Sequence, residues 1–160
     1  MPKPLMMNGD KMQSLLEKFA EALNGQVHEE RERRVKLSEI PTETEGVEPS
    51  IIKQGVLREV SKDDSVKAYA RIRMKKDPGK EVKYSLGVKH FPLSQEAETE
   101  ISKQMFDAFY PDNLDKPQEK KRYTLKNGWE IDVIDDGGIV AEFEHAKGDK
   151  VTVPKEWKRK

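Results

Sequence analysis

The sequence Glu30-Arg31-Glu32-Arg33-Arg34-Val35 carries charged side chains at alternating positions. In an extended strand, side chains two positions apart share one face, so Glu30, Glu32 and Arg34 would point to the same side. Two such carboxylates lie about 6–7 Å apart along the strand and can share a divalent cation. The guanidinium beyond them can hold an anion bound to that cation. An alternating charged run is also typical of a solvated edge strand or helix face, so the rest of the chain must distinguish the two interpretations.

The composition favours a folded protein with an unusual number of charges to place. The chain has 160 residues, which is enough for one domain with a core. Charged residues make up 38% of it, against about 25% in typical proteins, yet the formal net charge is zero. A zero net charge provides no field that would attract DNA or a membrane surface. The alternation of apolar and polar residues argues against disorder, which leaves a fold whose interior is itself charged.

Other features exclude several kinds of site and location. The chain has no cysteine, which excludes disulfides, thiolate zinc sites and a cysteine nucleophile. It shows neither a long apolar run nor a signal peptide, so we expect a cytoplasmic protein that does not enter the membrane.

Hydrophobic periodicity predicts a mainly β protein of the α+β class. A capping pattern at Asp10 and an apolar stripe predict an N-terminal helix that ends at Asn24-Gly25, and Ser102 begins a second helix that stops at Tyr110-Pro111. Eight short strands with hairpin turns point to an antiparallel barrel, with the second helix between the fifth and sixth strands. The strands are expected at 27–37, 51–57, 67–75, 82–89, 96–101, 120–125, 129–134 and 139–144. We therefore divide the chain into an extension, 1–26, and a barrel domain, 27–160.

The charged faces of these strands carry ordered doublets of one sign, which are Glu30/Glu32, Arg71/Arg73, Lys120/Arg122 and Glu142/Glu144. Doublets of carboxylates together with doublets of cations suggest metal ligands opposite anion ligands. A divalent metal with a polyphosphate is the simplest partner for such a set. The alternative is a plain barrel whose charged faces meet solvent.

The order of these charged motifs along the chain resembles that of a known family. Glu30-x-Glu32-x-Arg34 is similar to the ExExK signature of the CYTH superfamily, the triphosphate tunnel metalloenzymes. Further marks follow in the family's order over about residues 27–157. They are Lys53-Gln54-Gly55-Val56-Leu57, Arg71-Ile72-Arg73, Tyr84-x-Leu86-x-Val88-Lys89, Glu96-Ala97-Glu98, Glu119-Lys120-Lys121-Arg122-Tyr123, Trp129-Glu130-Ile131-Asp132-Val133 and Val140-Ala141-Glu142-Phe143-Glu144.

The resemblance implies an eight-stranded tunnel in which acidic residues hold Mg²⁺ or Mn²⁺ and basic residues clamp a triphosphate. The metal ligands carried over are Glu30, Glu32, Glu142 and Glu144. The triphosphate ligands are Arg34, Arg71, Arg73, Lys89, Lys120 and Arg122, and Glu98 matches a further acidic position of the tunnel. Glu30, Glu32, Arg34 and Asp132 would be catalytic, with Asp132 near the metals or orienting water.

By this resemblance the expected activity is metal-dependent hydrolysis of inorganic triphosphate or of an organic or nucleotide triphosphate. Two alternatives stay open: a class IV-like adenylate cyclase, and a non-catalytic module that binds nucleotides, polyphosphate or a triphosphorylated RNA end. Arg34 stands where the signature has lysine, and the family's C-terminal extension has no counterpart after Trp157. Both departures bear on substrate and turnover. The oligomeric state is left open, with a homodimer through the N-terminal helix as one arrangement.

Overall fold

The structure is a computed structural model that describes residues 28–29, 31–63, 66–91, 95–110, 115–146 and 148–160. The predicted N-terminal helix and Glu30 lie outside these residues. The described part is mainly β, as predicted. Its elements are β1 (His28–Glu29), β2 (Arg31–Leu37), the short 3-10 helix η1 (Thr42–Thr44), β3 (Ser50–Asp63), β4 (Val66–Lys76), β5 (Lys83–Phe91), β6 (Gln95–Ile101), α2 (Lys103–Phe109), β7 (Asp115–Thr124), β8 (Glu130–Ile134) and β9 (Ile139–His145).

The described strands form one sheet in the order β1-β6-β5-β4-β3-β7-β8-β9-β2. Neighbours are antiparallel wherever their register is described, as expected for hairpin connections. The first predicted strand is divided into β1 and β2, which are consecutive in the chain but stand at opposite ends of this order. The helix between the fifth and sixth predicted strands is confirmed as α2. Closure of the sheet into a barrel stays a prediction.

Two strands are longer than the sequence pattern predicts. β3 continues from Ser50 to Asp63, well past the predicted end at residue 57, and β7 begins at Asp115 rather than at residue 120. The added segments are polar, with no alternation of apolar side chains to mark them. Backbone hydrogen bonds to a neighbouring strand do not depend on side-chain polarity, so the sheet continues where the hydrophobic pattern does not.

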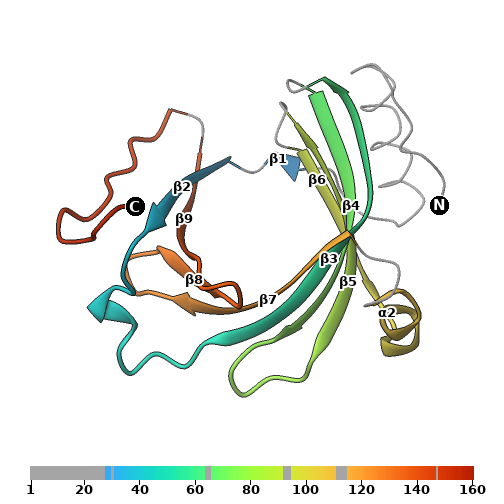
Figure 1. The fold of residues 1–160 in the computed structure, drawn as a ribbon, viewed down its shortest axis with the longest axis horizontal. Helices are drawn as coiled ribbons and strands as arrows, with labels where there is room; N and C mark the ends of the chain where they lie inside the picture. Colours follow the sequence, from blue (N-terminus) through green and yellow to red (C-terminus); the bar gives the residue numbers. More distant parts are fainter. Residues whose placement is uncertain (1–27, 30, 64–65, 92–94, 111–114, 147) are drawn as a thin grey trace. The chain divides into compact units, whose positions relative to one another are not determined.

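The chain groups into two compact units. The first contains Met1–Glu29, Gln54–Met74 and Lys83–Pro117, and the second contains Glu30–Lys53, Lys75–Val82 and Gln118–Lys160. The second unit therefore holds β2, β7 from Gln118 onward, β8 and β9, and Figure 1 shows these strands following one another in the sheet.

The apolar core of the second unit lies on one face of its strands. A cluster of buried residues joins the strands to the segment that follows β9, and it consists of Val35, Leu37, Leu125, Trp129, Ile131, Ala141, Val153 and Trp157. The ring of Trp129 meets Trp157 edge-on at 5.3 Å between centroids and Phe143 at 5.4 Å. The packing of these large rings buries apolar surface that a small unit needs for stability.

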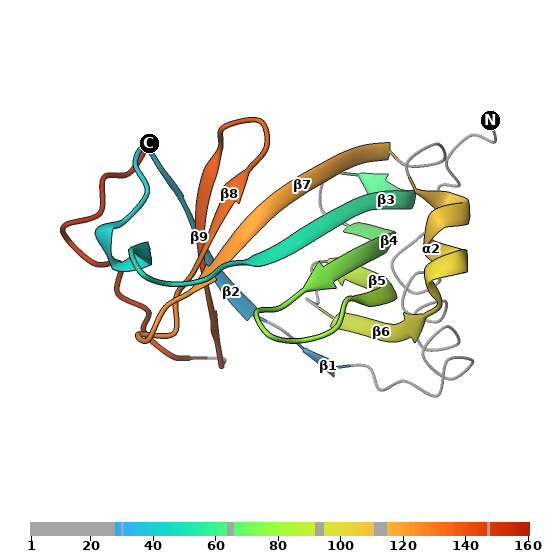
Figure 2. The same ribbon diagram turned by 90° about the horizontal axis from the view of Figure 1, so that it is seen from below.

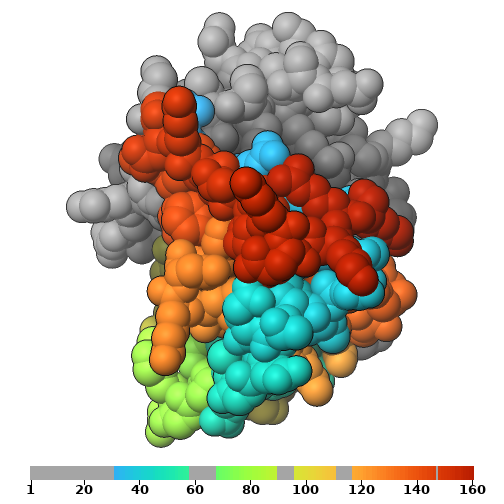
Figure 3. Space-filling model, turned by 90° about the vertical axis from the view of Figure 1, so that its left-hand side faces the viewer, coloured from blue at the N-terminus to red at the C-terminus, as the bar shows by residue number. Residues whose placement is uncertain are grey.

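The last residues are also tied to β2 by backbone hydrogen bonds. The amide of Ser38 donates to the Lys158 carbonyl at 2.9 Å, and the amide of Lys160 donates to the Lys36 carbonyl at 3.0 Å. Figure 3 shows this segment, in red, against the loop after β2, in cyan. The C-terminal segment thus covers the apolar face, and the opposite face of the same strands must carry the alternating charged residues.

In the first unit, helix α2 packs an aromatic side chain against β5. The N-cap of the predicted helix is confirmed, because the hydroxyl of Ser102 accepts a hydrogen bond from the amide of Met105 at 3.1 Å. Phe106 is buried; its ring stacks on Tyr110 and lies tilted against Tyr84, each at 5.1 Å between ring centroids. Figure 2 shows α2 at the end of β5 and β6. No helix among the described residues is long and apolar enough to cross a membrane.

Candidate metal and anion site

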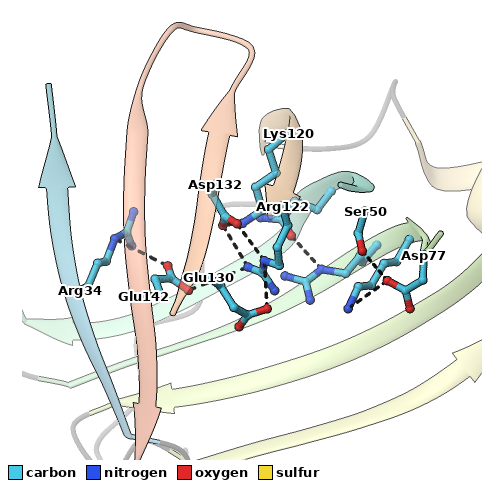
Figure 4. A network of polar contacts seen from close by, with 11 residues as sticks. Arg34, Ser50, Asp77, Lys120, Arg122, Glu130, Asp132 and Glu142 are labelled. Atoms are coloured by element: carbon cyan, nitrogen blue, oxygen red, sulfur yellow. Dashed lines mark hydrogen bonds and ion pairs between the residues drawn. The ribbon is translucent and has the colours of Figure 1, made fainter. Parts of the chain in front are cut away.

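Asp132 is the centre of a buried ionic network in the second unit (Figure 4). Its side chain is 2% exposed and accepts from Lys120 Nζ at 2.7 Å, from Arg122 Nε at 2.8 Å and from Arg122 Nη2 at 3.0 Å. The register explains the contacts: Arg122 on β7 lies directly opposite Asp132 on β8, and Lys120 lies diagonally beside it on the same face. One carboxylate therefore holds both members of the predicted basic doublet.

The pKa values of this network follow from burial and pairing. Burial alone raises the pKa of Asp132, but the hydrogen bond from Arg122 and the charges of Arg122 and Lys120 outweigh it, so the pKa lies below its ordinary value. Burial alone lowers the pKa of Arg122, but Asp132 and the neighbouring glutamates outweigh it and raise that pKa. Both groups are therefore charged at neutral pH.

Arg122 also lies between two glutamates that face each other across the sheet. Glu130 on β8 is directly opposite Glu142 on β9, an arrangement that is repulsive for two carboxylates. Arg122 Nε is 3.7 Å from Glu130 Oε2, and Arg122 Nη2 is 3.8 Å from Glu142 Oε2. On the other side of Glu142, Arg34 Nε lies 3.8 Å from Oε1. The predicted anion ligands Arg34 and Arg122 thus flank a predicted metal ligand.

Glu142 is the carboxylate in this group whose pKa is raised above its ordinary value. Burial raises its pKa, and the charges of Glu32 and then Asp132 raise it further, against the opposing effect of Arg122 and Lys120. The pKa is therefore above its ordinary value even with two cations nearby. A divalent cation would relieve this repulsion between carboxylates.

The donor set fits Mg²⁺ or Mn²⁺ held partly by a substrate. Mg²⁺ is usually bound by one or two carboxylates together with waters and phosphate oxygens. Glu142 and Glu32 can supply two carboxylates, whereas the described residues contain no cluster of three or more His, Asp or Glu side chains placed to hold a metal. Asp132 fits less well as a ligand, because hydrogen bonds from Lys120 and Arg122 already engage both of its oxygens. The residues present therefore fit a metal that a phosphate ligand helps to bind.

Glu144 and Glu32 form the outer end of the same face. They are partners across β9 and β2, and both are exposed. Glu30, the remaining predicted metal ligand, lies outside the described residues.

The first unit contains a second ionic cluster, around Glu96. Its side chain is 9% exposed and lies 3.5 Å from Arg71 Nη2 through Oε1 and 3.7 Å from Lys89 Nζ through Oε2. Glu98 reaches the same Arg71 nitrogen at 3.6 Å, while Arg73 Nε donates to the Gln54 side-chain oxygen at 2.8 Å. The structure thus joins three predicted residues, Arg71, Lys89 and Glu98, around one buried acid.

Glu96 and Glu130 are the ionic residues of these clusters that the sequence analysis did not select. Glu96 lies directly opposite Lys89 on β5, and this pairing is the signal that could have identified it. Glu130 lies two residues before Asp132 and so shares its face. Both acids lie next to predicted anion ligands on a neighbouring strand. This proximity can be recognised only when the pairing of the strands is known.

No protein-family model matches the chain, and no curated protein matches it in sequence. Among solved structures, two of the protein NE1496 match it, one named as an inorganic triphosphatase and the other as a hypothetical protein. The first has a TM-score of 0.52, is 22% identical, and the match covers 80% of this chain and 86% of that one. The second has a TM-score of 0.50 at 22% identity, with 81% and 87% covered.

These matches span most of both chains, and at 22% identity they show that the folds are alike. The resemblance noted in the sequence is therefore confirmed at that level: the chain has the fold of the inorganic triphosphatase NE1496.

Proposed function

We propose that this protein binds a triphosphate-bearing anion together with Mg²⁺ or Mn²⁺ and hydrolyses a phosphoanhydride bond. The observation that carries the proposal is the charged face of the second unit, where Glu142 on β9 lies between Arg34 on β2 and Arg122 on β7, with Glu32 also on β2. Support also comes from the fold shared with a protein named as an inorganic triphosphatase. Inorganic triphosphate is the simplest substrate consistent with both.

The acidic residues of the site would hold the metal. Glu142 and Glu32 are the ligands supported by position and charge, and Glu144 and Glu30 are the further ligands that the resemblance implies. When bound, the divalent cation would neutralise charge on the phosphates and polarise the bond to be cleaved.

Arg34 would bind and orient the anion. Its side chain is 61% exposed, and its 3.8 Å contact with Glu142 is an ion pair rather than a hydrogen bond, so an anion from solution can reach the guanidinium. Arg122 has five N–H donors, of which Asp132 takes two, so the remainder can contact phosphate oxygens. These cations stabilise the negative charge that accumulates during phosphoryl transfer.

Asp132 would position the cations of the site. It fixes the orientation of Arg122 and neutralises Lys120, which is 8% exposed. A rigid guanidinium loses little entropy when it binds a phosphate. In the first unit, Glu96 would act in the same way on Arg71 and Lys89, which the resemblance implies as triphosphate ligands.

The direct test is release of phosphate from inorganic triphosphate, ATP and GTP with Mg²⁺ or Mn²⁺, and again after adding a chelator. We expect release that requires the metal and falls by at least about tenfold in Glu142→Gln, since ligand losses at metal sites have effects of this size or larger. Glu48→Gln, a change of the same chemistry at an exposed loop position, is the matched control and should leave the rate unchanged.

Two results would contradict hydrolysis. Release that ignores the chelator, or that is equal in Glu142→Gln and Glu48→Gln, would place the activity elsewhere. Tight binding of triphosphate without release under either metal would identify the protein as a binding module.

A further inference from the structure

Helix α2 of the first unit carries two large apolar side chains on an exposed flank. Met105 and Phe109 are 45% and 41% exposed, and because they are four positions apart they lie side by side along the helix. Phe106, next to Met105 in the chain, is buried and packs against the sheet, so the exposed pair borders the packed face of α2. Single exposed apolar residues are ordinary on a protein surface, whereas two adjacent ones on a short helix form a patch that another segment can cover.

The opposite flank of α2 is polar. Lys103 Nζ lies 2.7 Å from Asp107 Oδ2, in an ion pair whose side chains are 70% and 53% exposed. An exposed ion pair of this kind is well solvated and gains little from being covered. An apolar segment that packs on α2 would therefore approach from the flank of Met105 and Phe109.

The register of β1 directs the N-terminal part of the chain toward this helix. β1 is antiparallel to β6, with His28 opposite Glu96, so residues that precede His28 would lead toward the end of β6, where α2 begins (Figure 2). Ile101, the last residue of β6, lies five positions after Glu96, and Leu23 lies five positions before His28. A chain that keeps the direction of β1 would thus bring the end of the predicted N-terminal helix level with the start of α2.

The predicted N-terminal helix has an apolar surface that matches the exposed flank. Its apolar residues recur at helical spacing and are Met12, Leu15, Leu16, Phe19 and Leu23. At 1.5 Å per residue, a helix over 11–23 would be about 20 Å long, against about 10 Å for α2, so it can cover the whole flank. A helix of this length is marginally stable by itself in water and gains most of its stability by packing an apolar face.

We propose that residues 1–27 dock on helix α2 of the same chain, with the apolar stripe of the predicted N-terminal helix covering Met105 and Phe109. The docked segment would bury the apolar flank and leave the Lys103–Asp107 ion pair in solvent. The proposal concerns the first unit and does not depend on the proposed function.

The test uses the absence of cysteine from the chain, because an introduced thiol is then the only one. Met105→Cys places it on the apolar flank, and Gln104→Cys places it at an exposed position on another side of α2 as the matched control. The rate of modification by a water-soluble maleimide is measured for each variant of the intact protein. We expect Met105→Cys to react at least about tenfold more slowly, which corresponds to about 1.4 kcal/mol of docking free energy.

A second substitution tests whether the N-terminal segment provides the protection. Leu16→Asp places a charge within the apolar stripe and should restore fast modification of Met105→Cys. Ser14→Asp adds the same charge on the opposite face of the predicted helix and should leave the protection in place.

Three results would overturn the proposal. Equal rates for Met105→Cys and Gln104→Cys would mean that the flank is open. Protection that persists in Leu16→Asp, or that is lost equally in Ser14→Asp, would mean that the apolar stripe does not provide it. Protection that weakens as the protein is diluted would identify a second copy of the chain as the occupant.

Discussion

Replacing Asp132 by asparagine should destabilise the protein strongly although the two side chains have the same shape. Asp132 is 1% exposed and neutralises Lys120 and Arg122, whose side chains are 8% and 11% exposed. Removing the carboxylate leaves two buried cations without their closest counter-charge. Losses of this kind cost about 3–5 kcal/mol, a large part of the roughly 5–15 kcal/mol that stabilises a typical domain.

The loss of stability in Asp132→Asn can be measured by urea denaturation and by calorimetry. For a chain of this length, about 3–5 kcal/mol corresponds to a fall in the unfolding midpoint of roughly 6–20 °C. Asp135→Asn is the matched control, because Asp135 is exposed in the next turn, and we expect it to change stability by less than about 0.5 kcal/mol.

The pH dependence separates the charge effect from packing. Pairing holds the pKa of Asp132 below its ordinary value in the folded state, and in the unfolded chain the group titrates near about 3.9. Its contribution to stability is therefore fully present above that unfolded value and is lost as the pH falls through the folded value. The difference between wild type and Asp132→Asn should be largest near neutral pH and shrink in acid. A difference below about 0.5 kcal/mol at neutral pH, or one that is constant with pH, would refute this reasoning.

Three further predictions concern the same unit. Trp157→Ala should cost about 3–5 kcal/mol in urea denaturation, because it removes a buried ring packed against Trp129; a cost under about 1 kcal/mol would mean that the C-terminal segment does not stabilise this core. Gly128→Ala should lower the thermal unfolding midpoint more than Gly137→Ala. Both glycines have positive φ, but only at Gly128 would an added Cβ meet an aromatic ring, that of Phe143, at 2.9 Å. Equal losses in the two variants would contradict this. Mg²⁺ should raise the unfolding midpoint of the wild-type protein more than that of Glu142→Gln, since the cation relieves repulsion at that carboxylate; equal shifts would argue against this metal site.

Much of the fold follows from local patterns that need no tertiary information. The alternation in 67–75 and 82–89 and the turn residues Asn127-Gly128 predict strands and hairpins that the structure contains, because side-chain period and positive φ are local requirements. The helix after Ser102 was predictable for the same reason, since its cap is made within one turn. The extensions of β3 and β7 were not, because their sequences lack the alternation of apolar residues that marks a strand.

The candidate site likewise has features that the sequence determined and features that only the tertiary structure decided. The sequence alone determined which residues share a face, and so it grouped Lys120 with Arg122 and Glu142 with Glu144, because side-chain direction along a strand depends only on position. It did not determine which groups meet across strands. Pairing of β7 with β8 places Asp132 against Lys120 and Arg122, and pairing of β8 with β9 sets Glu130 against Glu142. Burial and register, which exist only in the folded sheet, decided that Asp132 binds Lys120 and Arg122 and that the pKa of Glu142 is raised.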